Sequence, residues 1–470
     1  MTTDDFDIAV IGAGSGGLTV AAAAAQFGRK VVLFERGKMG GDCLNYGCVP
    51  SKALLTAAKQ AHAMRSGAAL GIAAVVPQVD FAAVRAHVQR AIAAIAPHDS
   101  QERFEGLGVE VIRATARFVD QRTIEAGGAH FTARRIVIAA GSRPAVPPIP
   151  GLSEVPFFTN ESIFDNEVLP AHLLIIGGGP VGIEMAQAHA RLGAQVTVIA
   201  TGQPLAHDDP ELTSVVLAAL TSEGVTLVPG TTVARALKTG DSTTLETSDG
   251  RTFTGSHVLV ATGRRPNVED LGLDQAGVAF TPKGITVDAR LRTSNRRIFA
   301  IGDVAGGRFT HEAGYQAGIA IRNVLFALPA KASAHIPHVT YTDPELAQLG
   351  LTEADARASH GNAVNVLRAP FSGNDRAQAE GRTEGLVKVI TGARGRVLGV
   401  GIVGPGAGEL IQPWVLALQK DLKIGTMAGS VLPYPTRGEA GRRAAVGYFA
   451  GFASNTLVRN VIGLIGSLGR

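Results

Sequence analysis

Two segments of the chain share one layout, and they constrain the fold more than any other feature. They read DIAVIGAGSGGLTVAAAAAQFGRKVVLFERG (7–37) and HLLIIGGGPVGIEMAQAHARLGAQVTVIATG (172–202), an offset of 165 residues (172 minus 7). Each runs from an apolar strand through a glycine-rich turn into an apolar helix and then a second strand. The glycines at the shared positions are Gly12, Gly14 and Gly17 in the first copy and Gly177, Gly179 and Gly182 in the second.

One G-x-G-x-x-G pattern is weak support for a function, but two copies in the same strand–turn–helix context are typical of dinucleotide-binding units. The glycines permit a tight turn, close approach of a pyrophosphate and close packing of helix on strand, while the helix N-terminus holds the phosphates. The alternative is two ordinary glycine-rich turns. We therefore predict an α/β fold with two Rossmann-like dinucleotide-binding domains.

The two predicted sites differ at the position that meets the ribose. Glu35 lies 21 residues past Gly14 (35 minus 14) and is the acid expected on a ribose 2′-hydroxyl. At the same distance past Gly179 the second copy has Ala200, followed by Thr201. The second site thus lacks both a carboxylate and an adjacent arginine. The choice between NADH and NADPH stays open, with a lean to NADPH because no carboxylate would repel its extra phosphate.

Three further segments fit around these units. ARRIVIAAGSRP (133–144) and GSHVLVATGRRPN (255–267) each predict a strand that ends in a small-residue turn and closes a nucleotide domain. TSNRRIFAIGDVAG (293–306) predicts a strand leading to Gly302 and Asp303, whose carboxylate could accept hydrogen bonds from ligand hydroxyls or cap a helix. After about residue 336 the G-x-G-x-x-G pattern is absent, which indicates a third domain.

Composition excludes several classes. The net charge is +4 (44 minus 40) without a dense Lys/Arg block, and only 5% of residues are aromatic, so nucleic-acid binding is not expected. The first residues lack a basic, cleavable leader and no run reaches about 18 apolar residues, so we expect neither a signal peptide nor a membrane span. With only two cysteines in the chain, these features predict a cytoplasmic protein.

Both cysteines, Cys43 and Cys48, lie in GGDCLNYGCVPSK (40–52). In a regular helix, residues five apart lie roughly 8.7 Å apart at Cα, whereas a disulfide needs less than about 7 Å. If the two pair, the helix must be distorted between them, and Gly47 supplies the freedom. Such strain makes a bond reducible and suits catalysis. Two cysteines alone cannot complete a zinc site, and inert thiols are the plain alternative.

Together these motifs resemble the class I pyridine nucleotide-disulfide oxidoreductases, the flavoproteins that include dihydrolipoamide dehydrogenase and mercuric reductase. The resemblance spans the two fingerprints, the cysteine motif, TGRRPN (262–267), GD (302–303) and YTDPELAQLG (341–350). It implies an FAD-binding domain at 1–148 and 268–335, an NAD(P)H-binding domain at 149–267, and a C-terminal α+β dimerisation domain at 336–470. It also implies a homodimer in which the partner chain completes each active site.

The resemblance also implies a role for each motif residue. Cys48 is the thiol beside the flavin, Cys43 is the interchange thiol that meets the acceptor, and Lys52 pairs with Glu184 near flavin N5. Electrons would run from NADPH or NADH to FAD, to a Cys43–Cys48 disulfide, and on to a small thiol, disulfide or thiol-bound metal acceptor. The implied cofactor-binding residues are Gly12, Gly14, Gly17, Glu35, Arg36, Gly41, Lys52, Gly141, Gly302, Asp303, Gly177, Gly179, Gly182 and Gly263.

One segment departs from the disulfide reductases of this family. Where they carry a histidine followed by Pro-x-x-x-Glu, this chain has Tyr434 and Glu439. The reference pKa of tyrosine lies about 3.5 units above that of histidine, roughly 5 kcal/mol in basicity, so Tyr434 could donate a hydrogen bond but is a poor base. The tyrosine and GAGELIQ (406–412) resemble the mercuric reductase core, yet no cysteine follows Cys48 to form the C-terminal pair of those enzymes.

Two other functions fit the same motifs. One is a flavin-centred quinone or dye reductase in which the cysteines are incidental, and the other is a redox sensor without turnover. The apolar tail at 447–470 predicts packing at a dimer surface, with an interfacial helix on a membrane as the less favoured alternative.

Overall fold

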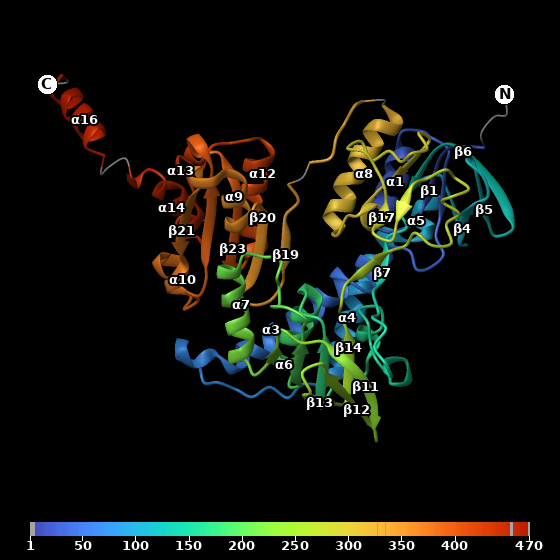
Figure 1. Ribbon diagram of the computed structural model, residues 1–470, viewed down its shortest axis with the longest axis horizontal. Helices are drawn as coiled ribbons and strands as arrows, with labels where there is room; N and C mark the ends of the chain where they lie inside the picture. Colours follow the sequence, from blue (N-terminus) through green and yellow to red (C-terminus); the bar gives the residue numbers. More distant parts are fainter. Residues whose placement is uncertain (1–4, 327, 334, 452–454, 469–470) are drawn as a thin grey trace. The chain divides into compact units, whose positions relative to one another are not determined.

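The computed structural model describes residues 5–326, 328–333, 335–451 and 455–468, and they form two compact units (Figure 1). The first comprises residues 1–61, 78–201 and 231–332, and the second residues 62–77, 202–230 and 333–470. Helices alternate with parallel strands in the first unit, which confirms the α/β class. The division into three domains stays a prediction.

A seven-stranded sheet organises the first unit. The order is β3–β2–β1–β6–β5–β4, with β18 paired to β6. The pairs among β3, β2, β1, β6 and β18 are parallel, and those among β6, β5 and β4 are antiparallel. The strands are β1 (Phe6–Ile11), β2 (Val31–Phe34), β3 (Val109–Ile112), β4 (Ala116–Phe118), β5 (Thr123–Ala126), β6 (Ala129–Ile138) and β18 (Ile298–Ala300).

The register of this sheet brings four chain segments to one edge. Ile11 pairs with Phe34 and with Ile138, and Ile138 pairs with Ala300. The turns that follow these four residues therefore leave the sheet side by side, at the carboxyl ends of parallel strands, where doubly wound folds bind ligands. They carry Gly12, Glu35, Gly141 and Asp303 in turn.

Both faces of the sheet are buried, because β1 alternates its side chains between two cores. Ile8 and Val10 pack with apolar residues of α1 (Ser15–Gln26) and α8 (Thr310–Leu325), two helices that lie side by side (Figure 1). The other face packs against β4, β5 and the segment around Leu271.

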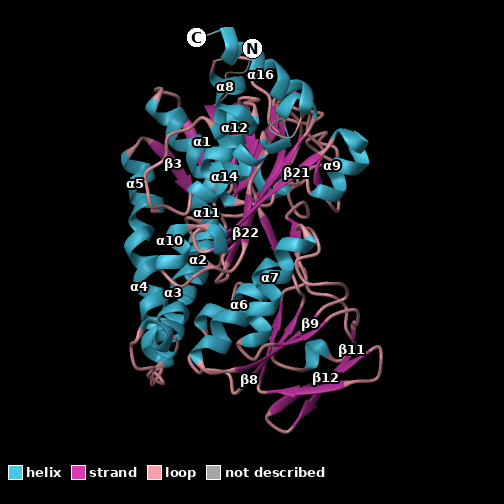
Figure 2. Cartoon of the chain, turned by 90° about the vertical axis from the view of Figure 1, so that its left-hand side faces the viewer, coloured by secondary structure: helices cyan, strands magenta, loops and turns pink. Residues whose placement is uncertain are grey.

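The second fingerprint builds its own parallel strands, ordered β9–β8–β14, with α6 packed beside β8 and β9 (Figure 2). The antiparallel sheet β11–β12–β13 and the pairs β7–β15 and β16–β17 complete the strands described in this unit. The bounds are β7 (Ser142–Pro144), β8 (His172–Ile176), β9 (Gln195–Ile199), β11 (Val233–Thr239), β12 (Ser242–Thr247), β13 (Thr252–Gly255), β14 (His257–Val260), β15 (Arg264–Pro266), β16 (Phe280–Thr281), β17 (Gly284–Ile285) and, for the helices, α2 (Gly41–Asn45), α3 (Cys48–Arg65), α4 (Phe81–Ile95), α5 (Gln101–Gly106) and α6 (Pro180–Leu192).

The second unit is built on a five-stranded antiparallel sheet, ordered β19–β20–β23–β22–β21. Trp414 and Phe371 lie in its core, packed against the buried sides of β22 and β23. Its elements are α7 (Pro210–Ser222), β10 (Thr226–Val228), β19 (His338–Thr340), β20 (Glu345–Gly350), α9 (Glu353–His360), β21 (Asn365–Pro370), α10 (Asp375–Ala379), β22 (Leu386–Thr391), β23 (Val397–Gly404), α11 (Ala407–Leu410), α12 (Gln412–Gln419), α13 (Ile424–Ala428), α14 (Glu439–Gly447) and α16 (Thr456–Leu468).

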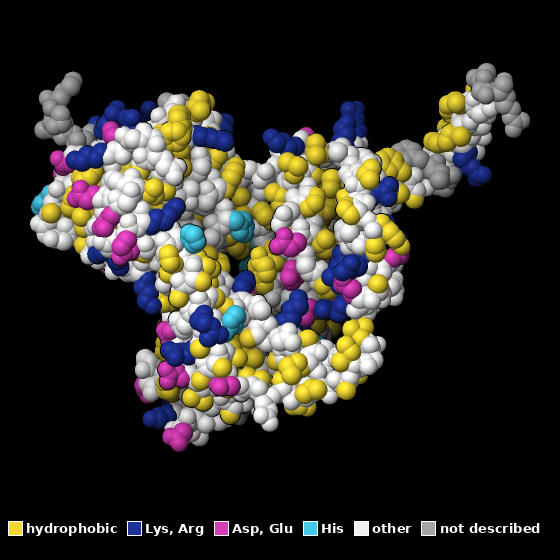
Figure 3. Space-filling view, turned by 180° about the vertical axis from the view of Figure 1, so that it is seen from behind, with side chains coloured by type: hydrophobic (Ala, Val, Ile, Leu, Met, Phe, Trp, Pro, Cys, Tyr) yellow, Lys and Arg dark blue, Asp and Glu magenta, His cyan; other side chains and the backbone are white. Residues whose placement is uncertain are grey.

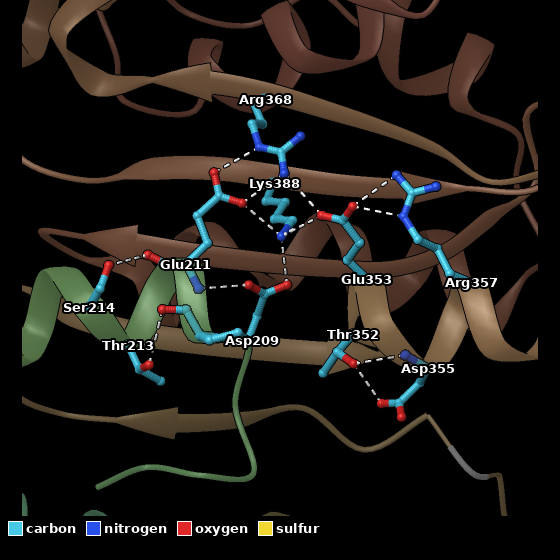
Figure 4. Close-up of polar contacts among 11 residues, drawn as sticks. Asp209, Glu211, Thr213, Ser214, Thr352, Glu353, Asp355, Arg357, Arg368 and Lys388 are labelled. Atoms are coloured by element: carbon cyan, nitrogen blue, oxygen red, sulfur yellow. Dashed lines mark hydrogen bonds and ion pairs between the residues drawn. The ribbon is translucent and has the colours of Figure 1, made fainter. Parts of the chain in front are cut away.

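A buried ion cluster ties α7 and α9 to this sheet (Figure 4). The ammonium of Lys388 on β22 lies 2.8 Å from a carboxylate oxygen of each of Asp209, Glu211 and Glu353. Arg368 on β21 donates to both oxygens of Glu211 and to Glu353. Only 3% of the Lys388 side chain is exposed, so the three carboxylates compensate a cation that burial alone would disfavour.

Candidate active site

The turn between β1 and α1 is shaped by backbone contacts that exclude side chains. Gly12 has φ +106°, and a Cβ there would lie 2.4 Å from the Ala139 carbonyl oxygen. A Cβ on Gly17 would lie 1.9 Å from the Gly12 carbonyl oxygen. Gly14 differs, because a Cβ there would meet no protein atom within 4 Å. The surface at the start of α1 is therefore left bare, as a phosphate cradle requires.

The second fingerprint repeats this construction. A Cβ on Gly177 would lie 2.3 Å from the Ala261 carbonyl oxygen, and one on Gly182 would lie 2.2 Å from that of Gly177. Gly179, at the start of α6, again faces no protein atom within 4 Å. The 165-residue sequence repeat is thus a repeat in three dimensions, with one bare helix N-terminus in each copy.

The remaining residues expected at the first site lie at the same sheet edge. Glu35 directly follows β2, and its carboxylate accepts from the backbone N–H of Ala13 (2.7 Å) and of Gly37 (2.6 Å). Arg36 is exposed beside it. A Cβ on Gly141, which has φ +67°, would meet no protein atom within 4 Å. The ends of these strands therefore place one carboxylate and an uncovered stretch of backbone beside the glycine-rich turn.

Asp303 follows Gly302 in a short 3₁₀ turn and does not cap α8, whose N-cap is Phe309. Its carboxylate accepts from the hydroxyl of Ser142, and Arg264 Nε lies 3.7 Å away. Burial raises the pKa of Asp303, although these two partners oppose the rise. The helix-cap alternative is therefore wrong, and the carboxylate faces a polar cluster.

Two glycines place the cysteine motif against the first nucleotide turn. Gly40 and Gly41 have φ +85° and +60°, which L side chains rarely adopt. A Cβ on Gly41 would lie 2.7 Å from Gly14 Cα, so the motif packs directly on the fingerprint. Helix α2 ends at Asn45, Tyr46 is non-helical and α3 begins at Cys48. The helix is therefore interrupted between Cys43 and Cys48, as a disulfide between them would require.

The two thiols are free in this structure, and their surroundings shift their pKa values in opposite directions. The pKa of Cys48 is lowered to about 6, first by a hydrogen bond from Cys43 and then by Thr310 and Lys52, against burial. The pKa of Cys43 is raised by the same pairing and by burial. These surroundings therefore favour the thiolate on Cys48 over the thiolate on Cys43.

Three groups beside Cys48 favour that thiolate. Its Sγ lies 3.3 Å from Thr310 Oγ1 at the start of α8, and Cys48 itself begins α3, where backbone N–H groups favour negative charge. Lys52, one turn further along α3, lies 2.9 Å from Glu184 on α6. The structure thus brings together the lysine and glutamate of the two motifs.

Replacing Thr310 with valine should raise the pKa of Cys48, because the thiolate loses a hydroxyl donor. A hydrogen bond to a charged group contributes about 1.5–3 kcal/mol, which corresponds to roughly one to two pKa units. The measurement is the pH dependence of iodoacetamide alkylation of the reduced enzyme, with mass spectrometry separating the two cysteines. Thr56→Val is the control, because the Thr56 hydroxyl donates to the Lys52 carbonyl. An unchanged midpoint in Thr310→Val would contradict the assignment.

Tyr434 and Glu439 lie in the second unit. Tyr434 is 70% exposed, and its hydroxyl donates to Asp375 (3.0 Å). That hydrogen bond raises the pKa of Tyr434. Glu439 begins α14 and accepts from the backbone N–H of Thr436 at 3.4 Å. The ionised form of Tyr434, the only form that could accept a proton, is therefore even less populated at neutral pH than the reference pKa suggests.

Several residues around the site carried no signal in the sequence. Arg264 donates to Ser142 and Asn160 and lies 3.1 Å from Asp42, the residue before Cys43. The sequence shows the two arginines of TGRRPN, but it does not show that Arg264 would pair with Asp42 of the cysteine motif. Thr310 and Asp375 were missed in the same way. Among the residues that the structure describes, no group of three or more His, Cys, Asp or Glu is placed to hold a metal ion.

The thiol pair packs on the first glycine-rich turn, and the Lys52–Glu184 ion pair joins α3 to α6, the helix that follows the second glycine-rich turn. This arrangement is that of a nucleotide-dependent dithiol oxidoreductase. The first site fits FAD, since the bare Gly14 cradle, Glu35 and Asp303 share the sheet edge beside the thiols. The second fits a pyridine nucleotide through Gly179 and Gly263, where added Cβ atoms would meet no protein atom within 4 Å.

Comparisons with known proteins give the particular family. Residues 6–318 match the pyridine nucleotide-disulphide oxidoreductases and residues 336–445 their dimerisation domain. The chain is 34% identical to a mercuric reductase from Bacillus cereus over 93% of its own length and 70% of the relative, and 37% identical to a dihydrolipoyl dehydrogenase from Thermus scotoductus over 94% and 96%. The structure of LpdA from Mycobacterium tuberculosis superposes with a TM-score of 0.87 at 26% identity, covering 94% of this chain and 100% of that one.

The HOCl-induced flavoprotein disulfide reductase RclA from Escherichia coli, solved as a Cu(II) complex, has a TM-score of 0.84 at 25% identity and covers 93% of this chain and 98% of its own. The chain belongs to the pyridine nucleotide-disulphide oxidoreductase family. It is an FAD- and NAD(P)H-dependent oxidoreductase and a homodimer. No helix of the described residues is long and apolar enough to cross a membrane.

Proposed function

We propose that the enzyme passes two electrons from NAD(P)H through the Cys43–Cys48 pair to a small thiol-linked acceptor, and that a thiol-bound soft metal ion is the acceptor class. The observation that carries the proposal is the setting of Cys48, which begins α3 and whose Sγ lies 3.3 Å from Thr310 Oγ1, with Cys43 as the second thiol of the motif. FAD, when bound, supplies the two-electron relay between the nicotinamide and the cysteines.

Residues of the chain stabilise the charges that form on the two sulfurs and hold the proton that the reduced pair keeps. Reduction of the Cys43–Cys48 disulfide adds two electrons and one proton and leaves the Cys43 thiol and the Cys48 thiolate. Thr310 and the α3 N-terminus hold that thiolate. Lys52 is fixed by Glu184 at 2.9 Å, so its positive charge stays near the reacting sulfurs.

The acceptor class follows from the replacement of the family's histidine by Tyr434. Attack on a disulfide needs the Cys43 thiolate, but the pKa of Cys43 is raised and Tyr434 is a poor base. A soft metal ion needs no such base, because thiolate ligation itself displaces the proton. In balanced form, M(SR)₂ with the Cys43 thiol, the Cys48 thiolate and one proton yields M⁰, two RSH and the Cys43–Cys48 disulfide. The metal takes the two electrons that the cysteines lose.

In this proposal, Tyr434 acts across the dimer. The tyrosine occupies the position of the family's histidine, so we assign Tyr434 and Glu439 of each chain to the active site of the other chain. Tyr434 would donate a hydrogen bond to the incoming acceptor, with Asp375 orienting its hydroxyl.

An acceptor panel tests the proposed function. The panel is run once with NADH and once with NADPH as the electron donor, and we expect thiol-bound Hg(II) to be reduced. Lipoamide and glutathione disulfide should be reduced at least about 100-fold more slowly, because disulfide reduction at this site lacks a base. Tyr434→His should raise the disulfide rates and change the metal rate little. Disulfide turnover that exceeds metal turnover in the unmodified enzyme would overturn the acceptor assignment.

A further inference from the structure

The C-terminal helix α16 presents a continuous apolar face to solvent. Apolar side chains gather along this helix in the space-filling view (Figure 3), and five of them are each at least half exposed. These five residues are Leu457, Val461, Ile462, Leu464 and Ile465. At 100° per residue they fall, with Val458, on one side of the helix. The opposite side carries only small or polar residues, namely Thr456, Arg459, Asn460, Gly463, Gly466 and Ser467.

The size of the helix fits a surface rather than a span. α16 has 13 residues, which is about 20 Å at the helical rise, against about 30 Å for the apolar layer of a bilayer. A short helix with a wide apolar side and a polar side of small residues is suited to lie in the plane of a membrane interface, with its apolar side inserted.

Two observations distinguish a bilayer from a second copy of the chain as the occupant. The match to the family's dimerisation domain covers residues 336–445, so α16 lies outside the matched segment. Residues 447–470 contain two arginines, Arg459 and Arg470, and no acidic residue. Two such tails would repel each other, whereas anionic phospholipid headgroups would attract both.

We propose that α16 is an in-plane anchor that binds bilayers containing anionic phospholipid. The apolar side provides insertion, and the arginines add an electrostatic attraction that salt weakens. This role is independent of the acceptor, and it places the reductase at a lipid surface without a membrane span.

The test is flotation of the full-length holoenzyme with phosphatidylcholine vesicles, with and without phosphatidylglycerol. We expect the enzyme to float with phosphatidylglycerol vesicles and added salt to reduce the bound fraction. Val461→Gln with Ile465→Gln should lower partitioning about tenfold or more. The matched control, Asn460→Gln with Ser467→Gln, makes the same kind of change on the polar side and should bind like the unmodified enzyme. Arg459→Gln should weaken binding only where phosphatidylglycerol is present.

Light scattering of the same variants tests the alternative that a second copy of the chain covers this face of α16. The proposal expects an unchanged dimer in every variant. It is overturned if the unmodified enzyme fails to float with either vesicle, or if the apolar-side variant floats as well as the control. It is also overturned if the apolar-side variant alone changes the oligomeric state, because the face would then be covered by a second copy.

Discussion

Replacing Cys43 with serine is expected to abolish reduction of thiol-linked acceptors, with a fall in kcat/KM of roughly 10³ or more. A hydroxyl neither ligates a soft metal ion nor forms the disulfide that carries the two electrons away. The structure makes this loss specific, because Cys43 and Cys48 are the only thiols in the chain. The measurement is NAD(P)H oxidation with thiol-bound Hg(II) as the acceptor.

Two controls separate this result from a folding defect. A dye acceptor that needs no thiol should be reduced by Cys43→Ser at close to the unmodified rate, and the flavin content should be unchanged. Cys48→Ser should lose the same thiol-dependent activity. Its remaining thiol is Cys43, which is not the thiol that the start of α3 and Thr310 stabilise. Full activity of Cys43→Ser with the metal acceptor would show that electrons leave the enzyme without the pair, as in a flavin-centred reductase.

The parts of this site that the sequence could predict are those set by neighbours in the chain. The glycine turns are local, since Gly17 is constrained by Gly12 only five positions away. Helix geometry predicts a break between Cys43 and Cys48 if the two are to pair, and Tyr46 between them is non-helical. Glu35 is found by its distance from the turn, because strand, helix and strand have nearly fixed lengths in such units.

The parts that could not be predicted depend on contacts between distant segments. Cys48 and Thr310 are 262 positions apart, and nothing around a threonine indicates that its hydroxyl will meet a thiol. The partner of Tyr434 is equally hidden, since Asp375 begins a separate helix. A charged residue on a strand such as β22 would be assigned to solvent, yet Lys388 is buried. These pairings are properties of the packed sheets rather than of any short motif.

Replacing that lysine by methionine is expected to be the most destabilising substitution outside the active site. Methionine keeps the length of the side chain but leaves Asp209, Glu211 and Glu353 facing an apolar group. Removing one partner from a buried ion network costs about 3–5 kcal/mol, or roughly 10 °C in Tm for a unit of this size. Thermal unfolding of the holoenzyme, followed by circular dichroism at neutral pH, measures the change. Lys420→Met is the control, since Lys420 is exposed in the same unit.

The pH dependence identifies the cause of that loss. The pKa of Glu211 is lowered from 4.5 to about 2, first by Arg368 and, against burial, by Lys388. A carboxyl group with a lowered pKa stabilises the fold above its ordinary pKa, and this contribution is lost as the pH falls toward about 2. In Lys388→Met the pKa of Glu211 should rise, because the nearby ammonium is gone, and protonation then relieves the repulsion among the three carboxylates. The gap in stability between the two proteins should therefore be widest at neutral pH and narrow as the pH falls below about 4.5. A gap that stays constant with pH would mean that methionine acts through packing, and no gap at neutral pH would mean that the cluster does not hold α7 and α9 to the sheet.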